Sequence, residues 1–168
     1  MTAPRSWEGG ARDRDATGRA RSDRPRDELG RPLPRSAASD TPRIPDDLVV
    51  TAAEAAELGG RLLSEGRPFH AHEVFEAAWK SVPGQERELW RGLAQIAVGL
   101  THARRGNARG AIALLRRGAD HVGPFASAPG AVDAGFVAAQ ATGIALRIER
   151  DGLASVPADD LRLRLRSG

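Results

Sequence analysis

After residue 50, apolar residues recur at the three- and four-residue spacing of amphipathic helices. Capping residues, glycines and prolines separate these stretches: a capping box at Thr51-Ala-Ala-Glu54 opens the first, and Asp133 opens the last. The pattern predicts five helices, at about residues 52–65, 68–80, 85–105, 108–121 and 134–151. The third contains the apolar sequence GLAQIAVGL and is expected to be the buried central helix.

Part of this helical region repeats at a spacing of 40 residues. The aligned pairs are Gly59 and Gly99, Leu62 and His102, Gly66 and Gly106, Ala71 and Ala111, and Phe75 and Leu115. The first copy also fits the tetratricopeptide pattern, at Leu58, Gly59, Leu62, Ala71, Phe75 and Pro83. Each copy predicts an αα-hairpin in which small residues allow two helices to cross closely. We therefore expect an all-α fold, a compact bundle of about five helices built from two tetratricopeptide-like αα-hairpins and a capping helix.

Flanking regions differ from this helical domain, which we place at residues 48–155. Residues 1–47 are rich in Arg, Asp, Pro and Gly and contain few apolar residues, so a disordered arm is expected. The alternative is a docking segment, and its anchors would be Leu29, Leu33 and Pro34.

The last region, residues 156–168, ends in the alternating sequence LRLRLR. This period of two predicts an extended tail that lays Leu161, Leu163 and Leu165 on the bundle. A short helix that begins at Asp159 and Asp160 is the alternative.

Composition excludes several classes of function. The 168 residues include no cysteine, which rules out disulfides, thiolate zinc sites and a cysteine nucleophile. The pI near 10.7 reflects 24 arginines, but the net charge is only +3 and the two signs are intermixed, so nucleic-acid binding is not expected. With no apolar run of roughly 20 residues and no apolar N-terminal signal segment, we expect a cytoplasmic protein without membrane contact.

Polar residues on the second predicted helix form half of a candidate site. In the sequence FHAHEVFEAAWK, His72, Glu76 and Trp79 lie within about 60° of one another around the helix axis. Glu73 lies on the flank of this face.

The third predicted helix supplies the other half. Gln95 and His102 share one face with Gly92 and Gly99. Glycine destabilises a helix interior, so we expect these two to permit close packing against the second helix. That packing would bring Gln95 and His102 toward His72 and its neighbours.

Three interpretations of this cluster remain open. It is a structural hydrogen-bond network, a divalent-metal site with His72, Glu76 and His102 as ligands, or a pocket for a small polar or anionic ligand. The zinc motif H-E-x-x-H is not met, because Glu76 stands where the second histidine would be. No arrangement of residues indicates a named reaction, so no catalytic residue is assigned.

Three sequence elements occur in order and carry a resemblance. They are A-H-E-x-x-E-x-x-W at Ala71, His72, Glu73, Glu76 and Trp79; G-L-x-Q at Gly92, Leu93 and Gln95; and R-G-N-x-x-G-A at Arg105, Gly106, Asn107, Gly110 and Ala111. Over residues 50–152 the chain resembles the family called domain of unknown function three hundred and nine, small helical proteins of bacteria, archaea and plants. Its arm is similar to the extension of actinobacterial members. The resemblance implies an all-helical fold and no established activity.

We therefore expect a binding or interaction module rather than an enzyme, with an unknown protein or a small polar molecule as its partner. Its candidate pocket lies between the second and third helices, at His72, Glu73, Glu76, Trp79, Gln95 and His102. The alternative is a metal-dependent enzyme, such as a hydrolase, centred on His72, Glu76 and His102.

Overall fold

The computed structural model describes residues 25–34, 36–37, 44–45, 47–125 and 132–167. In these residues five α-helices follow in chain order: α1 (Ala52–Ser64), α2 (Pro68–Ser81), α3 (Glu86–Arg104), α4 (Ala108–Val122) and α5 (Ala134–Asp151). Two short 3-10 helices come last, η2 (Leu153–Ser155) and η3 (Ala158–Leu161). The described residues form no β-strand, and the predicted all-α bundle is confirmed.

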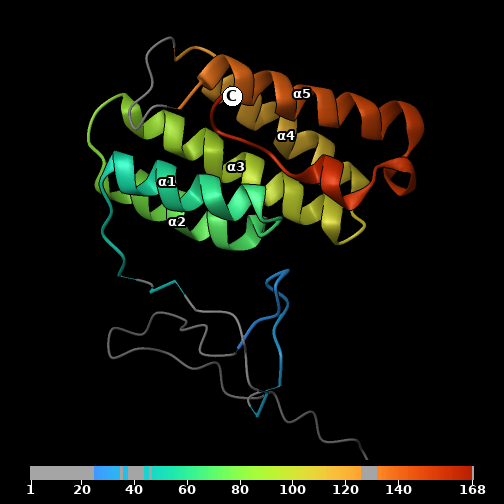
Figure 1. The fold of residues 1–168 in the computed structure, drawn as a ribbon, viewed down its shortest axis with the longest axis horizontal. Helices are drawn as coiled ribbons and strands as arrows, with labels where there is room; N and C mark the ends of the chain where they lie inside the picture. Colours follow the sequence, from blue (N-terminus) through green and yellow to red (C-terminus); the bar gives the residue numbers. More distant parts are fainter. Residues whose placement is uncertain (1–24, 35, 38–43, 46, 126–131, 168) are drawn as a thin grey trace, which may run out of the picture.

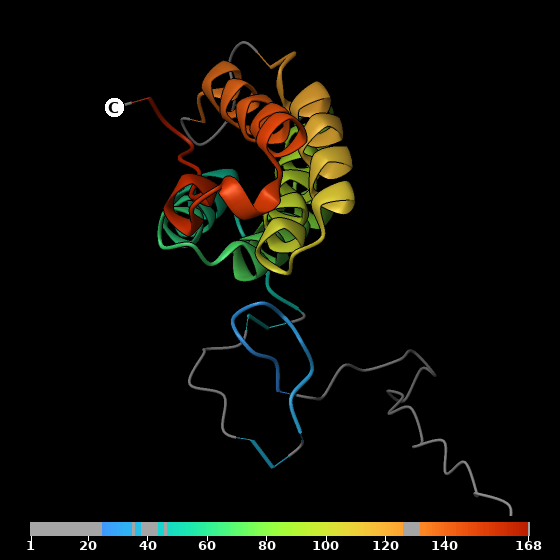
Figure 2. The ribbon, with the colours of Figure 1, turned by 90° about the vertical axis from the view of Figure 1, so that its right-hand side faces the viewer.

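Successive helices pack side by side and follow one another around a curve (Figures 1 and 2). The C-terminal segment passes between α5 and α1 and closes the ring of elements seen in Figure 2. Because α3 packs against both α2 and α4 and contributes the largest set of buried residues, the predicted central helix is confirmed. None of the described helices has the length and apolar character needed to cross a bilayer.

The helix ends follow the capping chemistry of the sequence. Thr51 and Glu54 form the predicted reciprocal capping box. Asn107 and Asp133 accept hydrogen bonds from the third backbone amide of α4 and of α5, each about 3 Å long. These local bonds set the N-terminus of three helices.

The repeat seen in the sequence is also a structural repeat. Gly66 and Gly106 end α1 and α3 with φ angles of 74° and 81°, a left-handed conformation that favours glycine. One residue further, the amides of Arg67 and Asn107 bond back to the helix, to the carbonyls of Leu62 and His102 at 2.8 and 2.9 Å. The two αα-hairpins, α1–α2 and α3–α4, therefore share the same connection.

The glycine face of α3 packs against α4, so the expectation that it packs against the second helix is wrong. A Cβ atom on Gly92 would lie 2.7 Å from Val122 Cγ2 and 3.0 Å from the backbone oxygen of Gly118. On Gly99 it would lie 3.0 Å from Leu115 Cγ. These glycines are required where two backbones approach each other. The α2–α3 contact is instead made by large side chains, among them Phe75 and Trp90, whose rings are 6.1 Å apart.

The C-terminal tail combines both predicted alternatives. Asp159 and Asp160 lie in η3, and the chain after it is extended. Leu161, Leu163 and Leu165 are buried, as the alternation predicted. Leu165 lies against Gly60 of α1, so this segment joins the last element of the chain to the first helix.

Most of the predicted disordered arm, residues 1–47, lies outside the described residues. Residues 25–33 are described and form a turn with an antiparallel bridge between Arg26 and Pro32. This turn lies beside the N-terminal end of α2 (Figure 1). Of the three anchors proposed for a docking segment, Leu29 makes a contact through its backbone oxygen, which accepts a hydrogen bond from Arg105.

The close α3–α4 crossing predicts a strong effect of a single methyl group. A Cβ on Gly118 would lie 2.5 Å from Ile96 Cγ1 and 2.8 Å from the Gly92 oxygen, so Gly118→Ala should lower the free energy of unfolding by about 1–3 kcal/mol. Gly143 of α5 has no such neighbour within 4 Å, and Gly143→Ala should raise it by about 0.5–1 kcal/mol. Urea unfolding measures both. Equal effects of the two variants would contradict the crossing.

The buried tail predicts that the C-terminus contributes to stability. Leu163 is fully buried, so Leu163→Ala should cost about 2–5 kcal/mol of unfolding free energy. Leu146 is 51% exposed, and Leu146→Ala should change stability by less than about 0.5 kcal/mol. A Leu163 variant as stable as the Leu146 variant would show that the tail does not pack on the bundle in solution.

Candidate functional site

One stripe of α2 and one stripe of α3 form the face of the hairpin that contains most of the predicted site. On α2, Phe69, His72, Glu76 and Trp79 recur at spacings of three, four and three, and all four are half-buried. On α3 and its C-cap residue the stripe consists of Arg87, Arg91, Gln95, Val98, His102 and Arg105, each half-buried or exposed. We call these ten residues the outer face of the α2–α3 hairpin.

The contact between Trp79 and Arg87 joins the two stripes. The guanidinium carbon of Arg87 lies 5.2 Å from the centre of the Trp79 ring, a cation–π geometry. Together with the Phe75–Trp90 ring contact, it fixes how the antiparallel helices align. One helical turn from the Phe75–Trp90 contact, His72 lies at the level of about residue 94 along the axis of α3. The α3 residue that contacts Trp79 is Arg87, which lies outside the stripe predicted for α3.

His72 and Glu76 lie together, as predicted. His72 Nε2 is 3.5 Å from one carboxylate oxygen of Glu76, and Lys80 Nζ is 2.7 Å from the other. The His72 side chain is only 27% exposed. Burial lowers the pKa of His72 and Lys80 lowers it further, while the Glu76 carboxylate opposes them. The structure thus favours a neutral imidazole here, next to a carboxylate that is shared with a lysine.

Gln95 contributes a buried acceptor to the same face. Its Oε1 atom is buried and accepts no hydrogen bond from the described residues. Such an atom costs free energy in the folded state, because water satisfies it in the unfolded chain. A purely structural network would be expected to satisfy it.

His102 is not brought to His72 and Glu76. Its Nδ1 atom lies 2.9 Å from Nδ2 of Asn107, the residue that caps α4, so its ring serves the connection between α3 and α4. The described residues contain no group of three or more His, Asp or Glu side chains placed to hold a metal ion. The three predicted ligands therefore do not form one centre. The reason is the same α3–α4 packing that turns this side of α3 toward α4.

Glu73 is half-buried on the flank of α2, as its helical position predicted. His70, two residues before His72, is buried, and its Nδ1 atom accepts or donates no hydrogen bond among the described residues. Burial lowers the pKa of His70, Arg67 adds to this, and Glu28 of the arm opposes it. The arm is thus close enough to act electrostatically on the start of α2.

Sequence reasoning missed five residues of the outer face: Phe69, Arg87, Arg91, Val98 and Arg105. The Phe69 ring lies 6.3 Å from the His72 ring, and the spacing of three residues between them was the available signal. Arg87 lies two helical turns before Gln95, a spacing that places both on one side of α3. Nothing in the local sequence indicated that Arg105 contacts the arm.

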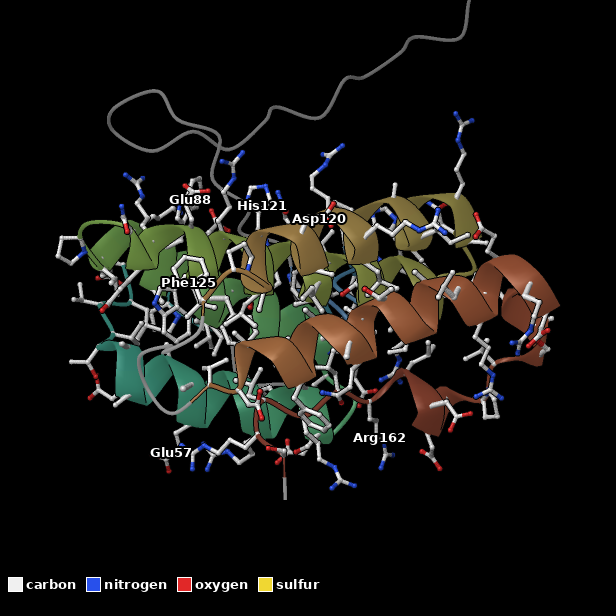
Figure 3. The ribbon with its side chains drawn as sticks, turned by 90° about the horizontal axis from the view of Figure 1, so that it is seen from above. Glu57, Glu88, Asp120, His121, Phe125 and Arg162 are labelled. Atoms are coloured by element: carbon white, nitrogen blue, oxygen red, sulfur yellow. The ribbon has the colours of Figure 1, made fainter. Side chains whose placement is uncertain are left out.

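A second polar contact lies on the α3–α4 side. His121 Nδ1 and Arg91 Nη1 each lie 3.3 Å from the same Glu88 oxygen. Figure 3 shows Glu88 and His121 next to each other at one edge of the bundle, far from Glu57 and Arg162 at the opposite edge. Because the Glu88 and Arg91 side chains are about half exposed, this is a surface ion-pair cluster of modest energy.

A cavity of about 310 Å³ lies elsewhere, between α5 and the C-terminal segment. It is lined by Gln140, Gly143, Ile144, Arg147, Val156, Asp160 and Arg162. Its two arginines are already paired with the aspartates of η3. None of the residues predicted for the pocket lines this cavity.

With the geometry established, the comparisons with known proteins identify the class of chain. Residues 57–114 match the family described as Domain of unknown function (DUF309). Over these residues, which run from α1 into α4, the match confirms the resemblance carried by the three sequence elements. No curated protein and no solved structure matches the chain.

The lowered pKa values of His70 and His72 predict that stability falls with acidification. Below about pH 6.5 the unfolded chain binds protons at both histidines that the folded chain resists, so the unfolding free energy decreases from pH 7 toward pH 5. Replacing both by glutamine should flatten this part of the profile, as measured by urea unfolding at several pH values. An unchanged slope in the double variant would show that other groups cause it.

Proposed function

We propose that this protein is a binding module whose outer face, around His72 and Gln95, receives a polar ligand. The observation that carries the proposal is the buried Gln95 Oε1 atom, which has no hydrogen-bond donor among the described residues. An unsatisfied buried acceptor costs about 1–3 kcal/mol, and rotation of the Gln95 side chain toward a ligand that donates a hydrogen bond would remove this cost in the complex.

The chemistry of the outer face favours a ligand rich in hydrogen-bond donors. Glu76 is a carboxylate, and a neutral His72 offers an acceptor on one ring nitrogen. An amide, amine or guanidine could donate to these groups. The Trp79 ring, with Arg87 over it, supplies a flat apolar wall beside them.

Binding is favoured over acid–base catalysis because the Glu76 carboxylate already has two partners. Glu76 is shared between His72 and Lys80, and its side chain is 36% exposed. A general base is usually activated by burial or by an isolated partner. We therefore propose no reaction for this face.

The experiment compares two glutamines with opposite environments. Gln95→Met removes an acceptor that has no donor, so stability should stay equal or rise by about 1 kcal/mol. Gln140→Met removes an amide that bonds to the backbone of Arg164 at 2.8 and 3.1 Å, and should cost about 1–3 kcal/mol. Urea unfolding gives both values.

The same variants are then tested for binding. A panel of amides, amines and guanidines, with matched carboxylates and phosphates, is screened by thermal shift on the wild-type chain. A compound that raises the melting temperature should lose its effect in Gln95→Met and keep it in Gln140→Met. A strongly destabilised Gln95→Met variant would instead support a structural role for Gln95 and contradict the proposal.

A further inference from the structure

We propose that the end of the outer face formed by Phe69 and Arg105 is a peptide-binding site, and that the chain's own arm occupies it with the turn at residues 25–33. This inference stands independently of the ligand proposed for His72 and Gln95. The peptide class it recognises is a tight turn with an arginine before it and a glycine at its end.

The turn is ordered by its own hydrogen bonds. The Asp27 carboxylate accepts from the amides of Leu29 and Arg31 at 3.0 and 2.7 Å, an Asx-type turn. The Arg26 side chain bonds to the Gly30 oxygen at 2.7 Å, and the Leu33 amide bonds to the Pro25 oxygen at 2.7 Å. A preorganised segment loses little conformational entropy on docking, which makes it a suitable ligand.

Phe69 recognises the turn in two ways. The guanidinium carbon of Arg26 lies 5.9 Å from the centre of its ring. Gly30 has a φ of 72° and packs directly against the same ring. A Cβ atom on Gly30 would lie 2.2 Å from two carbons of the Phe69 ring. The site therefore selects glycine both by backbone conformation and by space.

Arg105 recognises the backbone of the same turn. Its guanidinium donates a hydrogen bond to the carbonyl oxygen of Leu29. Phe69 begins the α2 stripe and Arg105 ends the α3 stripe, so helices that run in opposite directions bring the two to the same end of the outer face. Figure 2 shows the turn below this end of the bundle, on the side of α2. A ring contact, a steric requirement for glycine and a backbone hydrogen bond together define a recognition site.

The first experiment detects the docked turn in the full-length chain. The hydrogen of Gly30 that points along the Cβ direction faces the Phe69 ring, so its NMR signal should be shifted by the ring current. Phe69→Ala should return the signal to its random-coil position. Phe136→Ala, which removes a half-buried ring from α5, should leave it shifted.

Two results would overturn the proposal at this stage. One is a random-coil Gly30 signal in the wild-type chain. The other is a Gly30 shift that is lost on dilution at the same concentration at which a dimer dissociates. In that case the turn would occupy the site of a second copy of the chain and not its own.

The second experiment offers the turn as a separate ligand. The probe is a fluorescent peptide of residues 25–34, and binding is measured by anisotropy. In the wild-type chain the tethered turn competes with the probe at high effective concentration. A full-length Gly30→Leu chain cannot bind its own turn in the site, so it should bind the probe at least tenfold more tightly than the wild-type chain. Adding Arg105→Ala to Gly30→Leu should abolish the gain, whereas adding Arg109→Ala, an exposed arginine of α4, should not.

A probe that itself carries leucine in place of Gly30 should not bind. Equal binding by the wild-type and Gly30→Leu chains, or no binding to Gly30→Leu at millimolar probe, would overturn the peptide-binding site.

Discussion

The approach of two helix backbones at Gly92, Gly99 and Gly118 is the constraint on which the remaining structure depends. Where α3 crosses α4, the backbone oxygen of Gly92 lies close to Gly118, and that of Gly118 lies close to Gly92. No side chain larger than hydrogen fits between the two helices at this point. This contact commits one face of α3 to α4 and leaves the large residues of another face, such as Trp90, to pack against α2. The stripe between these two contacts, from Arg87 to Arg105, is the part that remains at the surface.

The outer face gains its chemistry from that arrangement. Its polar residues are held at the edge of tightly packed helices, where they are partly removed from water but not fully paired with one another. Gln95 is the clearest case, and the lowered pKa of His72 expresses the same partial burial. At one end of this face, Phe69 contacts both the His72 ring and the arm, so the two proposed binding regions are physically adjacent.

Much of the α3–α4 crossing was implied by the sequence repeat. Gly59 and Gly99 are equivalent positions, and each faces the large residue of its own hairpin, Phe75 or Leu115. The alignment therefore indicated that Gly99 packs against α4. Helical periodicity alone, which shows that residues share a face but not which element covers it, led instead to α2 and so misplaced His102.

The sequence by itself determined the helices, their caps, the glycines that end α1 and α3 and the apolar alternation of the tail. These features depend on residues within a few positions of one another, so local rules suffice. It also grouped His72 with Glu76, because both lie on one helix. Only the tertiary structure decided that His102 bonds to Asn107, that Gln95 lacks a donor and that Leu29 meets Arg105. Such contacts depend on which helix packs against which. That arrangement is set by the packing of many side chains that are distant in the sequence, and no local signal reports it.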